Sequence, residues 1–291
     1  MKKFLLQTCL SLAFFSPLLT QAQFQKLDSL DKSGTKLYYS KGYKERADKL
    51  AALVSSAINY NNALLGFKPE VSLLVLSKED WSLYTDMPVF GMPHYTSEKV
   101  LVVAAHNNDF WKSFIPPLEQ LPQELANNIK VVYQQDGEIS MQAFFDLLAL
   151  HELGHAFHQQ GGLQMQRKWM GEFFCNVFLH TYIAENKPGL LPALKVFPEM
   201  VVAGGAPGEF TSLDQFEKYY NEIATKHPRN YGWYQSRFHV EAGVLYDKGG
   251  KEVLVKLWNA LEKQELMDDG AFAKYLSAEV HEGLGQLVKN W

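Results

Sequence analysis

The segment His151-Glu152-Leu153-Gly154-His155 combines two histidines and a glutamate at a spacing that suits metal chemistry. Residues four apart on a helix lie on one face, one turn apart, so the imidazoles of His151 and His155 can converge on a single tetrahedral ion. Glu152 would then lie within reach of a water molecule on that ion. The pattern therefore predicts a Zn²⁺ site in which both histidines bind the metal and Glu152 acts as a general base.

The residues that precede this segment indicate a core helix whose polar face is turned to a cleft. Two buried histidines bonded to neighbouring groups would be the simplest alternative, but the full pattern of three residues on such a helix favours a metal site. His281-Glu282 begins in the same way and has Gly285 where the second histidine should stand, so it lacks the pattern. The apolar residues of the preceding turns are Phe144, Phe145, Leu147, Leu148 and Leu150.

A catalytic zinc site needs a third protein ligand and one open position for water. Glu172 is the best candidate, because it lies on the next predicted helix and Gly161-Gly162 supplies the turn that folds this helix back. A straight helix carries His158 about 4.5 Å further along its axis than His155, so we expect His158 beside the ligands. Cys175 could offer a thiolate, although its apolar neighbours are more typical of a small buried residue.

With this third position the sequence resembles the gluzincins, the thermolysin-like and M1-aminopeptidase-like zinc peptidases. Trp169-Met170-Gly171-Glu172 is similar to the segment that provides the third ligand in M1 enzymes. The metzincin pattern fails, since its third histidine would stand at Gly161. Asn176 occupies the place where thermolysin-like enzymes have an acidic residue that orients a ligand histidine. The resemblance implies a Zn²⁺ ion held by His151, His155 and Glu172.

The same resemblance implies a tyrosine on a later helix that donates a hydrogen bond to the oxyanion of the tetrahedral intermediate. Tyr234 is the first choice, because Phe238 and Gly249 follow it at the spacings of M1-like enzymes. Tyr231 and His239 lie in the same predicted helix and remain alternatives. Tyr234 is therefore predicted as the second catalytic residue, after Glu152.

The segment Phe90-Gly91-Met92-Pro93-His94 lies where these folds place an edge strand that pairs with an extended substrate. It lacks the Gly-x-Met-Glu-Asn signature by which M1 aminopeptidases hold a free amino terminus. We therefore expect a peptide or protein substrate, and both internal and terminal cleavage stay open.

The elements that must position these residues form an α+β pattern, in which short strands precede long helices. Residues 71–76 and 100–104 are predicted strands, and 43–65 is a predicted helix. We expect a small, mostly antiparallel sheet with an active-site helix, followed by a largely helical lobe, as in zincins. One domain should span 23–291, with a β-containing lobe to about 165 and a helical lobe from about 166. The later predicted helices cover 140–160, 168–186, 211–224, 231–248, 250–263 and 270–289.

Residues 1–22 are typical of a secretory signal peptide, with Lys2 and Lys3, an apolar run and a small-residue end at Ala22. A secreted or periplasmic protein is therefore expected, and no later segment is apolar enough for a membrane span. The net charge of −4 becomes more negative without the leader, and no basic block offers a nucleic-acid footprint. Only Cys175 remains after cleavage, so no internal disulfide is expected.

These observations together predict a secreted zinc metallopeptidase that hydrolyses peptide bonds with a metal-activated water and Glu152 as the base. Two other functions share the same residues. A non-catalytic zinc-binding scaffold or binding protein would keep the fold and the ligands, although the presence of Glu152 counts against it. A zinc-dependent amidase on cell-wall peptide would use the same chemistry on another substrate.

Overall fold

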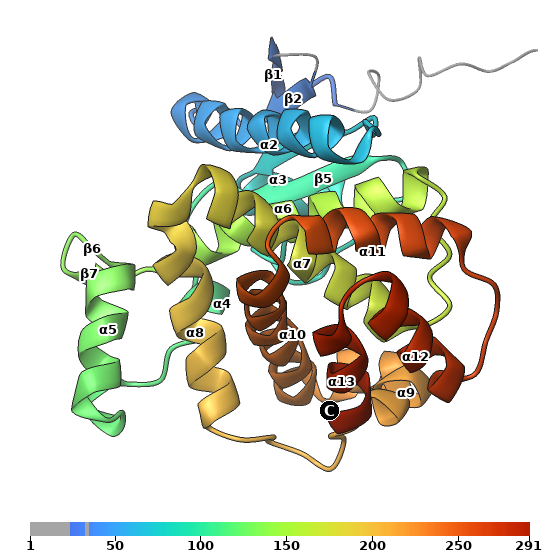
Figure 1. Ribbon diagram of the computed structural model, residues 1–291. Coiled ribbons are helices and arrows are strands. Elements are labelled where there is room, and N and C mark those ends of the chain that lie inside the picture. The colour runs from blue at the N-terminus through green and yellow to red at the C-terminus, as the bar shows by residue number, and fades with distance from the viewer. Residues whose placement is uncertain (1–23, 33–34) are drawn as a thin grey trace, which may run out of the picture.

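The computed structural model describes residues 24–32 and 35–291 (Figure 1). The predicted signal peptide, residues 1–22, lies outside the described residues. A small sheet is followed by a large helical lobe, so the predicted α+β class is confirmed. Among the described helices, none combines the length and apolar content that crossing a bilayer requires.

The sheet has five strands in the order β1-β2-β3-β5-β4 and is mixed, so the prediction of a mostly antiparallel sheet is wrong. Its central pairs, β2 with β3 and β3 with β5, are parallel, and only the outer pairs β1 with β2 and β4 with β5 are antiparallel. The parallel pairs arise because a helix connects β2 to β3 and another lies between β3 and β5. The strands are β1 (Asp28–Lys32), β2 (Thr35–Tyr39), β3 (Ser72–Leu76), β4 (His94–Tyr95) and β5 (Val100–Ala104).

Helix α2 (Lys44–Leu65) connects β2 to β3 and packs against the sheet (Figure 1). Its buried face carries Leu50, Val54 and Ile58, which explains the helical periodicity of the sequence. The helix ends at Gly66, whose φ of 70° is the left-handed conformation that glycine adopts without a steric penalty. The predicted helix over 43–65 is therefore confirmed.

Helices α6 (Gln142–Gln160) and α7 (Lys168–Asn186) pack against each other in the centre of the molecule. Gly154 lies at their contact, and a Cβ atom there would stand 3.0 Å from the Cα atom of Cys175. The glycine therefore lets the two helix backbones approach closely. Helix α6 also contacts β4 and β5, so it joins the sheet to the helical lobe.

The remaining helices include three that were not predicted, α4, α5 and α8. The predicted helix over 270–289 is divided at Val280 and His281 into two helices. His281 is the N-cap of the second one, where its side chain accepts a hydrogen bond from the Gly283 amide. These helices are α3 (Lys78–Tyr84), α4 (Asp109–Lys112), α5 (Gln123–Tyr133), α8 (Leu191–Ala203), α9 (Leu213–Lys226), α10 (Pro228–Gly249), α11 (Glu252–Lys263), α12 (Asp269–Glu279) and α13 (Glu282–Asn290).

Candidate metal centre

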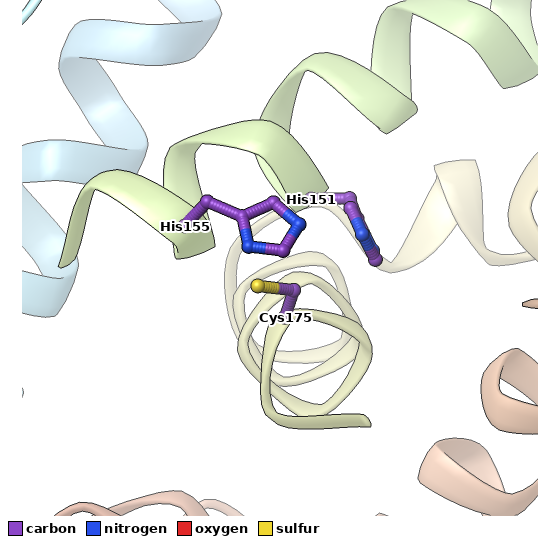
Figure 2. A group of neighbouring side chains, drawn as sticks. All are labelled: His151, His155 and Cys175. Carbon is purple, nitrogen blue, oxygen red and sulfur yellow. The ribbon is translucent and has the colours of Figure 1, made fainter. Parts of the chain in front are cut away.

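Helix α6 presents His151 and His155 to helix α7, one turn apart and with their ring centroids 5.1 Å from each other (Figure 2). The side chain of His151 is 7% exposed and that of His155 is 19% exposed. The structure therefore confirms that the two predicted ligands share one face of a helix in the core.

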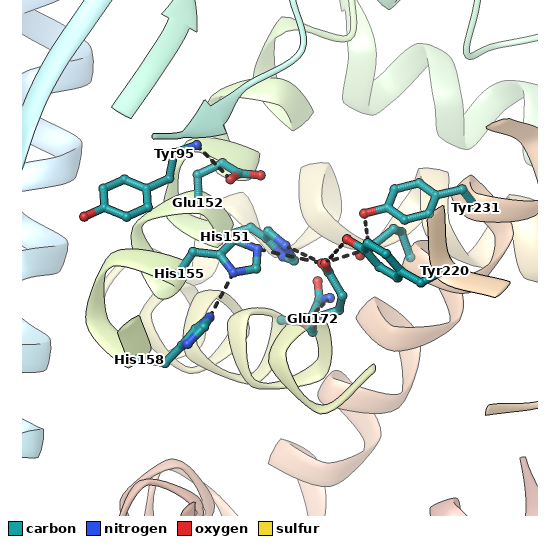
Figure 3. Close-up of polar contacts among 10 residues, drawn as sticks. Tyr95, His151, Glu152, His155, His158, Glu172, Tyr220 and Tyr231 are labelled. Carbon is teal, nitrogen blue, oxygen red and sulfur yellow. Dashed lines mark hydrogen bonds and ion pairs between the residues drawn. The ribbon is translucent and has the colours of Figure 1, made fainter. Parts of the chain in front are cut away.

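Helix α7 brings Glu172 to both histidines, as the sequence predicts. One carboxylate oxygen of Glu172, Oε2, lies 3.2 Å from Nε2 of His151 and 3.8 Å from Nε2 of His155 (Figure 3). A tetrahedral ion with bonds of about 2.0–2.1 Å would separate its ligand atoms by about 3.3 Å. The two measured separations lie close to that value, so the Glu172 carboxylate is near enough to each histidine to share an ion with it.

The electrostatics of the cluster favour an ionised Glu172 and a neutral His155, whereas His151 tends to hold a proton that a metal would have to displace. Burial opposes the charge of Glu172, but the bond with His151 and the proximity of His155 outweigh it and lower the pKa of Glu172 to about 2. Burial also lowers the pKa of His155 to about 4. The pKa of His151 is raised, because the carboxylates of Glu172 and Glu152 together outweigh the effect of burial. At neutral pH, Glu172 is therefore ionised, and His155 is uncharged with a nitrogen lone pair that can bind a metal.

The second ring nitrogens of the two predicted ligand histidines differ, because that of His155 contacts His158 and that of His151 has no hydrogen-bond partner among the described residues. His158, on the same helix, places its Nε2 3.0 Å from Nδ1 of His155. Nδ1 of His151 and Oδ1 of Asn176 are both buried without a hydrogen-bond partner, and Asn176 contributes to the raised pKa of His151. Such second partners fix the ring orientation of metal-binding histidines. His158 therefore lies beside a ligand, as predicted, and these residues suit a bound divalent metal.

Glu152 extends from helix α6 toward the edge strand β4. One of its carboxylate oxygens accepts a hydrogen bond from the backbone amide of Tyr95, at 3.1 Å (Figure 3). Burial and the nearby charge of Glu172 raise the pKa of Glu152 to about 7, although His151 opposes the shift. A carboxyl group with this pKa can both accept and release a proton near neutral pH.

Cys175 lies one helical turn after Glu172 and also faces the two histidines (Figure 2). Potential ligand atoms of His151, His155 and Cys175 all lie within 4.8 Å of one another. Burial raises the pKa of this thiol well above its usual value, which disfavours the thiolate that binds metals. Glu172, which is already ionised and hydrogen-bonded to His151, is the better third ligand, and Cys175 is the alternative.

The Tyr234 hydroxyl bonds away from this cluster, and its role as the oxyanion donor stays a prediction. Its hydroxyl donates to the carbonyl oxygen of Ser212, at 2.8 Å, and its ring stacks on Trp291. His239, another alternative, lies behind His151 with ring centroids 6.2 Å apart and is buried. Of the three residues considered from the sequence, Tyr231 is the one whose hydroxyl belongs to the cluster.

Two residues that the sequence did not single out join Tyr231 beside Glu172, and Figure 3 shows one of them, Tyr220. The Tyr220 hydroxyl donates to Oε1 of Glu172 at 3.0 Å. The Gln235 amide donates to Oε2 of Glu172 and to the Tyr231 hydroxyl, each at 2.9 Å. Gln235 follows Tyr231 by four residues on α10, a spacing that could have indicated a shared face. Tyr220 comes from α9, and no local pattern connects it to the zinc motif.

Comparison of the chain with protein-family models, with curated proteins and with solved structures finds no match. The resemblance to gluzincins therefore depends on the site residues themselves.

Proposed function

We propose that this protein is a secreted zinc-dependent peptidase of the gluzincin type. The observation that carries the proposal is the convergence of His151, His155 and Glu172 from two packed helices, with Glu152 beside them. Two imidazoles and one carboxylate are the ligand set of zinc peptidases, and they leave one coordination position open. A ligand set of this kind is expected in a catalytic site rather than in a closed structural one.

A bound zinc ion supplies Lewis acidity, which polarises a carbonyl group and makes water a nucleophile at neutral pH. The protein supplies the proton transfers and the hydrogen bonds. Glu152 accepts the proton of the attacking water on its carboxylate and donates it to the leaving amine nitrogen. Tyr231 keeps its proton, because burial raises the pKa of its hydroxyl. Gln235 donates to the Tyr231 oxygen and the Tyr231 hydroxyl bonds to Tyr220, so its proton would turn from Tyr220 to the oxyanion in the reaction.

The edge strand β4 supports a peptide substrate. Among the described strands β4 pairs with β5 alone, and an extended segment could add to its other edge if the Tyr95 amide exchanged its bond with Glu152 for one with the segment. The Tyr95 amide of this strand contacts Glu152, which places a substrate strand bound there next to the general base. Peptide or protein is therefore the proposed substrate class.

Metal removal tests the proposal directly. The purified full-length protein should contain about one zinc ion per chain, measured by atomic absorption, and should cleave members of a mixed peptide library. Dialysis against a chelator should abolish cleavage, and one equivalent of zinc should restore it. Cleavage that persists in the metal-free protein would contradict the proposal.

A structural metal site is the second candidate, because Cys175 also lies near both histidines. A thiolate together with Glu172 would complete four protein ligands and leave no open position. The protein would then retain zinc and cleave no peptide, as expected for a scaffold or binding protein.

The choice of oxyanion donor predicts a difference between two tyrosines on α10. Tyr231→Phe should lower kcat by about 10²–10³-fold and leave the zinc content unchanged, since it removes only a transition-state hydrogen bond. Tyr234→Phe is the matched control and should retain most activity, because its hydroxyl bonds to Ser212 instead. Steady-state kinetics on one cleaved peptide give kcat for both variants. A larger fall in kcat for Tyr234→Phe than for Tyr231→Phe would identify Tyr234 as the donor.

A further inference from the structure

The two carboxylate oxygens of Glu172 have different environments. Oε2 faces the metal-binding nitrogens of His151 and His155, at 3.2 and 3.8 Å, and accepts a hydrogen bond from Gln235. Oε1 accepts a hydrogen bond from the Tyr220 hydroxyl at 3.0 Å (Figure 3). The carboxylate is therefore held with one oxygen toward the site and the other toward helix α9.

Helix α9 is attached to the site through several contacts other than Tyr220. At its start, Ser212 and Gln215 form a capping box, and the Ser212 carbonyl accepts the Tyr234 hydroxyl. Further along, the Glu217 carboxylate accepts the backbone amide of Lys168, at the start of α7, at 2.6 Å. These contacts fix α9 against the two helices that carry the site residues, α7 and α10.

A change of backbone direction aligns Tyr220 with Glu172. The preceding residue, Tyr219, has non-helical φ and ψ of −111° and 19°, so α9 is kinked immediately before Tyr220. Side chains before and after the kink therefore do not follow a single helical face. The Tyr220 side chain is partly buried, and Lys168 lies over its ring with Nζ 5.4 Å from the centroid. The ring thus has a defined position from which its hydroxyl reaches the carboxylate.

We propose that Tyr220 is a positioning residue that keeps Glu172 a one-oxygen metal ligand, so that one coordination position stays open. This inference rests on the proposed metal site. A carboxylate can bind a metal through one oxygen or both, and binding through both would occupy the position that water needs. The hydrogen bond from Tyr220 holds the second oxygen away from the metal. Gln235 orients the first oxygen, and the two donors act together.

The test compares Tyr220→Phe with wild type in the full chain, using Zn²⁺ and Co²⁺ as probes. The substitution keeps the ring and removes only the hydroxyl. Zinc affinity, measured by competition with a chromophoric chelator, should fall by about 10–100-fold, as is usual when a partner of a ligand is removed. The visible absorption of the Co²⁺-loaded protein should change, because the second carboxylate oxygen would replace water in the ligand set.

Tyr246→Phe is the matched control, since it removes a tyrosine hydroxyl whose partner is Glu185 on the surface rather than Glu172. It should leave both the affinity and the Co²⁺ spectrum unchanged. Gln235→Met provides a second test on the same carboxylate if Tyr220→Phe fails to fold by circular dichroism, and it should weaken zinc binding likewise. Wild-type affinity and an unchanged spectrum in the folded variant would overturn the role of Tyr220 alone. A wild-type protein that binds neither metal would overturn the proposed function itself.

Discussion

Replacing Glu152 with glutamine should abolish peptide hydrolysis and leave zinc bound. Glutamine has nearly the same shape, and its amide oxygen can still accept the hydrogen bond that Tyr95 donates. It cannot accept the proton of the attacking water, so kcat should fall by at least about 10²–10⁴-fold. Zinc content by atomic absorption and kcat on one cleaved peptide check the two halves of the prediction. Full activity in the variant would remove Glu152 as the base.

Glu282→Gln is the matched control, because His281-Glu282 begins like the zinc motif but lies at the start of α13. His281 there caps the helix through the Gly283 amide. The substitution should change neither zinc content nor hydrolysis. A loss of activity equal to that of Glu152→Gln would mean that the assay reports general damage rather than the loss of a base.

The raised pKa of Glu152 gives this variant a second signature, in the metal-free protein. Burial raises the pKa from an ordinary value of 4.5 to about 7, so the folded state holds this proton more tightly than the unfolded state does. Stability therefore falls as pH rises from about 4.5 to 7 and stays lower above it. Metal-free Glu152→Gln lacks this loss and should be more stable than metal-free wild type at pH 8, by up to about 3 kcal/mol, but not at pH 4. Urea unfolding in the presence of a chelator measures the difference.

The elements closest to the site could be predicted because their signals are local. The apolar residues of α2 and α6 recur at helical spacing, and β3 and β5 are short apolar runs. Strand direction carries no such signal, since it depends on how the connecting helices cross the sheet. The continuous burial of β3 and β5 fits their central, parallel place and explains why neither alternates between apolar and polar residues.

Helix α8 was missed because proline normally marks a helix end, and this helix contains Pro198 in its interior. Tertiary contacts support the helix at this point. The Tyr133 hydroxyl, from α5, donates to the Ala193 carbonyl at 2.8 Å and accepts the Phe197 amide at 3.2 Å. A side chain so distant in sequence cannot be anticipated from the proline alone.

In the candidate site, too, some residues could be predicted from local spacing and others depend on tertiary contacts. His151, Glu152 and His155 lie within two turns of one helix, so their spacing alone predicts their geometry. Tyr231 and Tyr234 are three residues apart on α10, and about 100° per residue separates their directions by about 60°. Which of them faces the site depends on how α10 is rotated, and the stacking of Tyr234 on Trp291 is part of what fixes it. That contact joins distant segments and has no signature in the motif.

Replacing Glu172 with alanine should remove zinc almost completely, whereas Cys175→Ala should keep it. Glu172 lies 3.2 and 3.8 Å from the two histidine nitrogens and supplies the negative charge of the ligand set. Removing a residue that only hydrogen-bonds to a ligand lowers metal affinity by about 10–100-fold. Removing Glu172, a ligand itself, should lower zinc affinity by more than that. Cys175 is buried, and its raised pKa keeps the thiol protonated until a metal displaces the proton. Both substitutions shorten a buried side chain of α7, and Glu172→Gln, which keeps the size of the side chain, controls for packing.

Zinc retained per chain after dialysis against a weak chelator separates the two ligand sets. If Cys175→Ala loses zinc and Glu172→Ala keeps it, the third ligand is the thiolate, and Glu172 is instead a hydrogen-bond partner of His151. A loss in both variants would mean that both side chains bind, which closes the fourth position and contradicts a hydrolytic role. If only Glu172→Ala loses zinc, the wild-type ligands are two histidines and one carboxylate, and one coordination position is open. Of these three patterns, only the last is compatible with the hydrolysis that Glu152 is expected to catalyse.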